Sequence, residues 1–383
     1  MIILNVLRYS PDFGGGMNQH LLTLTKTAKS KGHKIIFCFP AKKEWQTDLE
    51  SISKVLIVPE IQTPLRSGFP GILRKICEQN DVEVVHFHFF FSLPFSLALS
   101  PKSWKVPTVY HWHIPPVSLI DFLTPPDNFK GQIKRFIYTL VARLTDLRVI
   151  DKHISMSKEI SDLLLKNGWA SEKKISYIPN GVINISNNKR NFSNRSFTNL
   201  IIGTVSNFRF QKDYETLIKA FNILCKEGIK SELWLVGDGE TRPEIEQLAS
   251  GLGIKSSVRF IGTVPDPLEM YRQFDIFTLS THYEGHPLVI LEAMSFGLPI
   301  VATNISSVPE TISQNVNGLL VIHQDPTDLA EALRKLIVDP GLRTRLGQEA
   351  RRTVENQDSV KDWAQKIIKV YEECLTQGKN KIN

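Results

Sequence analysis

Short runs of β-branched and apolar residues alternate with helix-like patterns along the chain, and this alternation limits the fold more than any other feature. Between the first two runs, apolar residues recur at helical spacing from Met17 to Ala28, and Gly32 follows as a stop signal. The first half contains four runs with strand character, at residues 2–7, 35–39, 82–87 and 108–111. Strands separated by helices favour parallel sheets, so we predict an α/β fold.

The alternation restarts in the second half, and 383 residues suit two domains. Five further runs have strand character, at residues 200–206, 232–236, 258–261, 276–280 and 300–303. Residues 184–199 are rich in Asn, Ser and basic residues and have the composition of a linker. We predict a first domain over residues 1–183, a second over 200–358, and a C-terminal helix within 359–383 that packs back on the first domain.

Residues 129–148 form the clearest amphipathic helical pattern. Their apolar residues recur at steps of three and four, at Phe129, Ile133, Phe136, Ile137, Leu140, Leu144 and Leu147. The basic residues of the segment fall mostly on other faces of the helix. We predict that the apolar face is buried against the domain, and binding of a membrane surface is the alternative.

Positive charge is concentrated in the first half of the chain. Residues 1–195 contain 26 Lys and Arg against 15 Asp and Glu, a net charge of +11, whereas residues 196–383 contain 20 against 24, a net charge of −4. A basic domain favours nucleic acid, a phosphorylated substrate or an anionic membrane as partner, and general solubility is the simpler explanation.

The cysteines and the N-terminus bear on location. The four cysteines are far apart and form no C-x-x-C pair, which favours a reducing compartment. Met1 leads directly into a strand-like run, and no apolar stretch reaches the length of a membrane span. We expect a soluble cytoplasmic protein, with peripheral binding at the inner face of the membrane left open.

Residues 284–294, EGHPLVILEAM, begin where a loop passes into a predicted helix. Pro287 stands at the expected first helical position, where its missing N–H costs nothing. The free amides of Leu288 and Val289 would then form a phosphate site.

Two carboxylates flank this helix start. Glu284 precedes the helix and Glu292 lies more than one turn inside it, so they can contact different parts of one extended ligand. A carboxylate accepts hydrogen bonds from vicinal hydroxyls such as those of a ribose or a hexose. Two glutamates eight residues apart are by themselves usually solvated, but the loop, the proline and the strand that follows favour a ligand site.

The longer segment of residues 284–303, EGHPLVILEAMSFGLPIVAT, resembles the signature of the family 4 retaining glycosyltransferases, which have the GT-B fold. The resemblance implies two Rossmann-like domains with parallel sheets that face each other across a cleft. It implies that Glu284 faces the transferred sugar, that Glu292 binds the ribose, and that Gly285 and Pro287 belong to the donor site. His286 departs from the apolar residue usual at its position, which bears on the choice of sugar.

Two glycine-containing turns match the family in the same order along the chain. Gly15 and Gly16, in a triplet with Gly14, follow the first strand and resemble the acceptor-side loop that abuts the donor diphosphate. An ordinary flexible turn is the alternative, and the spacing is not that of an NAD-binding loop. Gly262 ends a predicted strand and, by the resemblance, lies near the nucleotide base.

The loop of residues 205–213, VSNFRFQKD, contains two cations that could hold a diphosphate. Family members place an Arg five residues before the Lys of this loop. Here Asn207 occupies that position, and Arg209 lies only three residues before Lys212. We predict that Asn207, Arg209 and Lys212 contact the donor, with Lys212 and Arg209 acting in catalysis.

Histidines cluster near the ends of two predicted strands. His113 matches the family histidine near the reacting carbon, and we predict a catalytic role for it. With His111, His86 and His88 it could also form a metal site. Enzymes with the GT-B fold generally work without a metal and no Asp-x-Asp is present, so we predict neither metal nor cofactor.

The resemblance implies a retaining glycosyltransferase of the hexosyltransferase type. The donor would be a UDP- or GDP-linked sugar, and the acceptor a hydroxyl of a glycan or a lipid-linked glycan in cell-surface polysaccharide or glycolipid synthesis. Nucleic acid is not an expected partner, and an anionic membrane surface is a candidate partner of the basic first domain. A nucleotide-sugar epimerase of similar fold and a non-catalytic subunit that binds sugar nucleotides are the alternatives.

Overall fold

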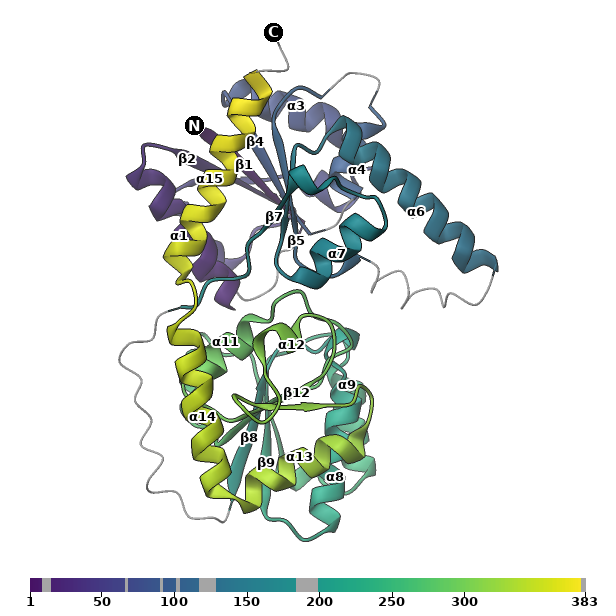
Figure 1. Ribbon diagram of the computed structural model, residues 1–383, viewed down its shortest axis with the longest axis vertical. Helices are drawn as coiled ribbons and strands as arrows, with labels where there is room; N and C mark the ends of the chain where they lie inside the picture. Colours follow the sequence, from purple (N-terminus) through teal and green to yellow (C-terminus); the bar gives the residue numbers. More distant parts are fainter. Residues whose placement is uncertain are drawn as a thin grey trace. The chain divides into compact units, whose positions relative to one another are not determined.

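A computed structural model of the 383-residue chain describes residues 1–8, 15–65, 68–89, 92–100, 104–116, 129–183 and 199–379 (Figure 1). The chain forms two compact units. Unit 1 contains Met1–Gly181 and Val360–Asn383, and unit 2 contains Val182–Ser359. The units therefore divide after Gly181 rather than after residue 183, and of the proposed linker only Asn199 is among the described residues.

Unit 1 is built on a seven-stranded parallel sheet with the order β3-β2-β1-β4-β5-β6-β7. Its strands are β1 (Ile2–Leu7), β2 (Lys34–Phe39), β3 (Lys54–Ile57), β4 (Val84–His88), β5 (Thr108–Trp112), β6 (Lys152–Ser155) and β7 (Ile175–Tyr177). The central strands β4 and β5 are buried along their whole length, as expected of parallel strands covered on both faces.

Helices cover both faces of this sheet. Its α-helices are α1 (Gly15–Ser30), α2 (Thr47–Glu50), α3 (Phe69–Gln79), α4 (Ser92–Ala98), α6 (Phe129–Arg148), α7 (Lys158–Lys166) and α15 (Val360–Lys379). The short 3₁₀ helices are η1 (Glu44–Gln46), η2 (Pro59–Gln62) and η3 (Glu172–Lys174). The C-terminal helix α15 lies beside α1 on one face (Figure 1), where Ile367 and Tyr371 share a core with Leu24. Helices α3, α4, α6 and α7 contribute to the core on the other face.

Most of the apolar face predicted for α6 is exposed rather than buried, although Leu144 packs against the core. Phe136 is 71% exposed, Leu140 60% and Leu147 80%. Helix α6 packs on α4 and on the core of unit 1 through Val141 and Ala142. Residues of α6 that lie one helical turn from these two also contact the core. An α-helix turns by about 100° per residue, so the exposed residues Phe136, Leu140 and Leu147 point in nearly the opposite direction to Val141 and Ala142. Helix α6 therefore has apolar residues on two faces. Figure 1 shows the first part of α6 projecting from the rest of unit 1.

Unit 2 repeats the architecture with a six-stranded parallel sheet of order β10-β9-β8-β11-β12-β13. Its strands are β8 (Leu200–Val205), β9 (Ser231–Val236), β10 (Val258–Gly262), β11 (Ile276–Leu279), β12 (Ile300–Thr303) and β13 (Leu319–Val321). The helices are α8 (Tyr214–Lys226), α9 (Arg242–Gly251), α10 (Leu268–Tyr271), α11 (Leu288–Ser295), α12 (Val308–Thr311), α13 (Pro326–Val338) and α14 (Pro340–Glu355), with η5 (Phe210–Lys212) and η6 (Lys255–Ser257).

The order of the strands places the functional loops of unit 2. Strands β8 and β11 are neighbours at the centre of the sheet, where the strand order reverses direction. In open parallel sheets, ligands bind outside the carboxyl ends of the strands at such a switch point. The loops that follow β8 and β11 are therefore brought together at the expected binding edge. The predicted α/β fold with two parallel sheets is confirmed.

Candidate functional site

The loop between β8 and α8 and the loop between β11 and α11 are tied together by hydrogen bonds. The His282 N–H donates to the Gln211 carbonyl over 2.8 Å, and the Gln211 side-chain amide donates to the Tyr283 carbonyl over 2.8 Å. The Ser280 hydroxyl donates to the Lys212 carbonyl over 3.1 Å. Each loop thus fixes the backbone of the other, which holds the side chains between them in place.

Lys212 and Glu284 meet between these two loops. Lys212 Nζ lies 2.6 Å from Glu284 Oε1, and their side chains are only 17% and 6% exposed. The Thr281 hydroxyl lies 2.9 Å from the same carboxylate oxygen, and the Gln211 amide lies 3.5 Å from the other one. Sequence analysis predicted both charged residues, and the structure places them in direct contact.

The helix α11 begins one residue later than predicted. Pro287 has an extended ψ of 110° and is the N-cap residue rather than the first helical residue. Its side chain accepts no hydrogen bond, and the first helical residues are Leu288 and Val289. Their amides stand at the positions where a helix has no internal acceptor. The predicted anion-binding end of the helix is therefore kept, with Gly285 and His286 leading into it.

Glu292 lies inside α11 and is almost fully buried. The Tyr271 hydroxyl donates a 2.6 Å hydrogen bond to Glu292 Oε2. Burial raises the pKa of the Glu292 carboxyl, and the hydrogen bond from Tyr271 opposes this by favouring the ionised form. Tyr271 is thus a positioning residue for Glu292, and sequence analysis missed it because nothing in the order of residues pairs position 271 with position 292.

Glycines after β9 allow the loop of Asn207 and Arg209 to approach the neighbouring strand end. A Cβ at Gly237, which has φ +130°, would lie 2.2 Å from the Ser206 carbonyl oxygen. Strand β10 ends beside it, because the Gly237 N–H donates to the Gly262 carbonyl over 2.8 Å. Asn207 is half-buried in this loop, whereas Arg209 is exposed. Gly262 therefore lies beside the glycine that allows the Asn207 loop to approach.

His286, the departure from the family pattern, is buried against α12. Its Nε2 lies 3.4 Å from the Thr311 hydroxyl. The imidazole is 8% exposed and follows directly after Glu284 and Gly285 in the chain. It thus lies next to Glu284 and Gly285, the two predicted donor contacts that precede it in the chain.

The four strand histidines of unit 1 lie on the face of the sheet that α1 and α15 cover. His113 Nε2 is 3.0 Å from His88 Nδ1, and His88 Nε2 is 2.9 Å from Asn5 Oδ1. His86 Nδ1 lies 2.7 Å from the Tyr371 hydroxyl of α15, and His111 is fully buried among the others. His113 itself is 8% exposed. The structure thus joins the two predicted pairs into one cluster.

Helix α1 adds a fifth histidine, which sequence analysis did not single out. His20 Nδ1 lies 2.9 Å from the Gly16 carbonyl oxygen, and its ring packs against Trp363 of α15 at a centroid distance of 4.8 Å. His20 therefore contacts the first turn of α1. Gly15 opens this helix, and Gly14 lies outside the described residues.

Burial makes all five imidazoles weak bases. It lowers the pKa of His20 to about 4 and that of His113 to about 3, and it lowers the pKa of His86, His88 and His111 well below the ordinary value. Each of these rings is therefore neutral in the folded protein at neutral pH, and His113 can only act there as a neutral hydrogen-bonding group.

We predict that unit 1 loses stability as the pH falls below about 6.5. Unfolded histidines bind protons near that pH, whereas the folded cluster stays neutral. Stability is therefore complete above pH 6.5 and falls by up to about 1.4 kcal/mol per pH unit for each histidine as the pH drops toward the folded pKa values. Urea unfolding followed by tryptophan fluorescence between pH 7.5 and 5.0 checks this. A midpoint that stays constant over this range would contradict it, and His20→Gln should reduce the slope.

No helix in the described parts of the chain has the length and apolar composition that a membrane crossing requires.

Family comparisons cover nearly the whole chain. Residues 14–183 match the family described as Glycosyltransferase Family 4, and residues 186–353 match the family described as Glycosyl transferases group 1. Among curated relatives, the capsular polysaccharide biosynthesis glycosyltransferase CapM of Staphylococcus aureus is 27% identical over 266 residues, covering 67% of this chain and 70% of the relative. The D-inositol 3-phosphate glycosyltransferase of Corynebacterium jeikeium is 25% identical over 88% of this chain and 86% of its own length.

Solved structures agree on the fold. The structure of Anabaena Alr3699/HepE in complex with UDP-glucose superposes with a TM-score of 0.76 at 20% identity, covering 97% of this chain and all of that one. Both halves of the chain match glycosyltransferase families in the order expected for two parallel-sheet units. The chain therefore belongs to the family 4 and group 1 glycosyltransferases and is a glycosyltransferase with the GT-B fold.

Proposed function

We propose that the protein is a retaining hexosyltransferase that moves a sugar from a UDP- or GDP-linked donor to a hydroxyl of a glycan or lipid-linked acceptor. The observation that carries the proposal is the contact between Lys212 and Glu284, held between two hydrogen-bonded loops next to the start of α11. A cation, a carboxylate and unpaired helix amides are the groups needed for a diphosphate and a sugar hydroxyl.

The chemistry of transfer places negative charge on the leaving diphosphate. Lys212, Arg209 and the amides of Leu288 and Val289 would neutralise that charge in the transition state. The leaving phosphate itself would take the proton of the acceptor hydroxyl, as the family resemblance implies. These groups supply the positive charge that a metal ion would otherwise provide, so we expect transfer without a metal cofactor.

In unit 1, His113 would contact the sugar near its reacting carbon. Its Nε2 is engaged with His88, so Nδ1 is the nitrogen that would face a hydroxyl. His88 Nε2 donates to Asn5 Oδ1, so His88 Nδ1 accepts from the Nε2–H of His113. With its single proton there and a pKa of about 3, the neutral His113 ring would act at Nδ1 by accepting a hydrogen bond from a sugar hydroxyl. Gly15 and Gly16 would allow the donor diphosphate to approach the backbone closely.

The relatives support the class of substrate. One is named for capsular polysaccharide biosynthesis, another for transfer to inositol phosphate, and the Anabaena structure is a complex with UDP-glucose. A nucleoside-diphosphate hexose and a polyhydroxy acceptor are therefore the first substrates to test, and synthesis of a cell-surface polysaccharide or glycolipid is the proposed setting.

The decisive experiment is a thermal-shift screen of UDP, GDP and their sugars with the full chain, because a ligand that binds only the folded state raises its melting temperature. The donor found is then incubated with an acceptor panel, and the anomeric configuration of the product is read by NMR. Retained configuration supports the proposal and inverted configuration contradicts it. A new epimer formed without acceptor would instead favour the epimerase alternative.

We also propose that α6 binds an anionic membrane surface. Its exposed apolar residues Phe136, Leu140 and Leu147 follow each other at helical spacing on the face opposite to the core. The helix contains five Lys and Arg and one Asp in its 20 residues. An amphipathic helix of this composition lies in the headgroup region of a bilayer, which suits a lipid-linked acceptor.

Replacing Phe136 and Leu140 by glutamate is expected to weaken binding to acidic liposomes by about 10-fold or more per residue, from the apolar burial lost. Co-sedimentation with and without acidic lipid measures this. Val338→Glu is the matched control, because Val338 is also an exposed apolar residue, at 68%, but lies in unit 2. If the wild-type protein does not sediment with liposomes that contain acidic lipid or with liposomes that lack it, the membrane proposal is contradicted.

A further inference from the structure

We propose that Asp213, His282 and His323 in unit 2 bind a divalent transition-metal ion of the zinc class. The three side chains come from the loops that follow β8, β11 and β13, and one ligand atom of each lies within 4.8 Å of the others. Two imidazoles and a carboxylate are a preferred donor set for Zn²⁺ and for its tetrahedral substitute Co²⁺. Asp213 follows Lys212 in the chain and His282 precedes Glu284 by two residues, but neither Lys212 nor Glu284 contributes a ligand atom to the cluster.

The distances fit a metal held between the three groups. His282 Nδ1 lies 2.8 Å from His323 Nε2 and 3.9 Å from Asp213 Oδ2. Ligand atoms bound at about 2.0–2.1 Å in a tetrahedron are about 3.3 Å apart. The first distance is shorter and the second longer than this value, and the third pair, Asp213 and His323, lies within 4.8 Å. The side chains would therefore shift by about 0.5 to 1.5 Å to surround a metal ion.

The rings are also oriented for coordination. His282 and His323 are perpendicular, at 87° with centroids 5.1 Å apart, and their nitrogens meet at the edge. An imidazole binds a metal through the lone pair in its own plane, and two perpendicular rings can direct those lone pairs at one point. When the metal binds, each neutral ring keeps its single proton on its other nitrogen.

Other contacts hold the ligands in place. Asp213 has a φ of +41°, unusual for a residue with a side chain, and it caps α8 by accepting the Thr216 N–H through Oδ1. Its Oδ2 is the oxygen that faces His282. The ring of Phe210 stacks on His282 at 4.4 Å. Strain and support of this kind are typical of functional sites.

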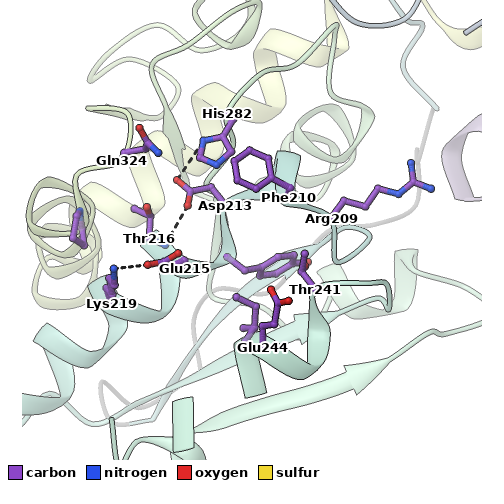
Figure 2. Close-up of a pocket in the computed structure, with 13 residues that line it drawn as sticks. Arg209, Phe210, Asp213, Glu215, Thr216, Lys219, Thr241, Glu244, His282 and Gln324 are labelled. Atoms are coloured by element: carbon purple, nitrogen blue, oxygen red, sulfur yellow. Dashed lines mark hydrogen bonds and ion pairs between the residues drawn. The ribbon is translucent and has the colours of Figure 1, made fainter. Parts of the chain in front are cut away.

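A cavity of about 290 Å³ lies beside the cluster, and Figure 2 shows His282 and Asp213 in its wall. Gln324, next to His323 in the chain, also lines it. The cavity gives a metal ion a route from solvent and leaves room for a water or an exogenous anion as the fourth ligand. In Figure 2, Arg209 points away from Asp213 and His282.

The histidine cluster of unit 1 is a poorer metal site. His86, His88 and His111 also have ligand atoms within 4.8 Å of one another. However, the rings of His86 and His111 are stacked nearly parallel, at 9° and 5.4 Å, so the rings would have to turn for their in-plane lone pairs to meet at one ion. His88 already uses both ring nitrogens, toward Asn5 and His113. Asp213, His282 and His323 are therefore the better candidate.

The test is titration of the metal-free full chain with Co²⁺, followed by displacement with Zn²⁺. We expect one equivalent of Co²⁺ to give the visible absorption of a tetrahedral site with nitrogen and oxygen ligands. His323→Gln should weaken Co²⁺ binding by more than about 100-fold. Loss of a residue that only hydrogen-bonds to a metal ligand costs up to about 100-fold in affinity, and loss of a ligand should cost more. Asp213→Asn should also weaken it, while an Asn can still cap α8 and tolerate positive φ.

His33→Gln is the control, because His33 lies in unit 1 and contacts Glu372 rather than the cluster. It should bind Co²⁺ as the wild type does. Three results would overturn the proposal: no Co²⁺ binding by the wild type, unchanged binding in His323→Gln, or the near-ultraviolet charge-transfer bands of a cobalt–thiolate site. Because the readout is metal binding, it does not depend on whether the proposed donor and acceptor are correct.

Discussion

Replacing Lys212 by alanine is expected to lower the rate of transfer by about 10²–10³-fold, the usual cost of removing one preorganised group that stabilises developing charge. The ammonium group is held by the Glu284 carboxylate at 2.6 Å and is largely shielded from water. Its charge would therefore act on a diphosphate bound there with little screening. Steady-state kinetics with the donor found in the screen measure the loss, and binding of the free nucleoside diphosphate should weaken as well.

Two further variants separate catalysis from folding. Lys226→Ala removes an exposed lysine at the end of α8 and should leave the rate unchanged. Lys212→Arg keeps the charge and should restore part of the activity, although the guanidinium needs more room than an ammonium. Near-normal turnover by a folded Lys212→Ala protein would remove the assignment of this loop to the donor diphosphate.

The sequence was most informative where an element is long or strongly patterned. The bounds of α6 and β12 match the predicted ranges, and the strands at the centre of each sheet were recognised from their β-branched runs. Strands β3, β6, β7 and β13 were missed, since three or four residues are too few to show a period. Strand β12 is just as short but was recognised because it lies within the motif of residues 284–303. Periodicity also revealed that α6 is amphipathic but not which of its two apolar faces the core would use.

For the candidate site, the sequence motifs located the charged residues but not the polar residues that hold them in place. Lys212 and Glu284 are 72 positions apart in the chain, and only the pairing of β11 with β8 brings their loops together. Gln211 and Thr281, which hold those loops, are ordinary polar residues in the sequence. His282 and His323 likewise do not stand out in the sequence. They lie close together only because the ends of three strands meet at one edge of the sheet.

Replacing Glu284 by glutamine is expected to lower the rate of transfer by about 10- to 100-fold, because a hydrogen bond to a charged group contributes about 1.5–3 kcal/mol. Glutamine has the same shape and can still accept from the Thr281 hydroxyl, which lies 2.9 Å from the carboxylate. It cannot bind a sugar hydroxyl as strongly as a carboxylate does. Glu331→Gln is the matched control, since Glu331 is an exposed residue of α13 in unit 2 that pairs with Lys335.

The effect on nucleotide binding should distinguish this variant from Lys212→Ala. In the wild type, the Glu284 carboxylate is attracted to Lys212. A diphosphate bound at Lys212 would be attracted to it as well, and the two anions would repel each other. Neutralising Glu284 removes that repulsion, so calorimetry should find UDP or GDP bound as tightly as before or more tightly, while turnover falls. If Glu284→Gln weakened nucleotide binding as much as Lys212→Ala does, the carboxylate would be holding the lysine in place rather than binding the sugar.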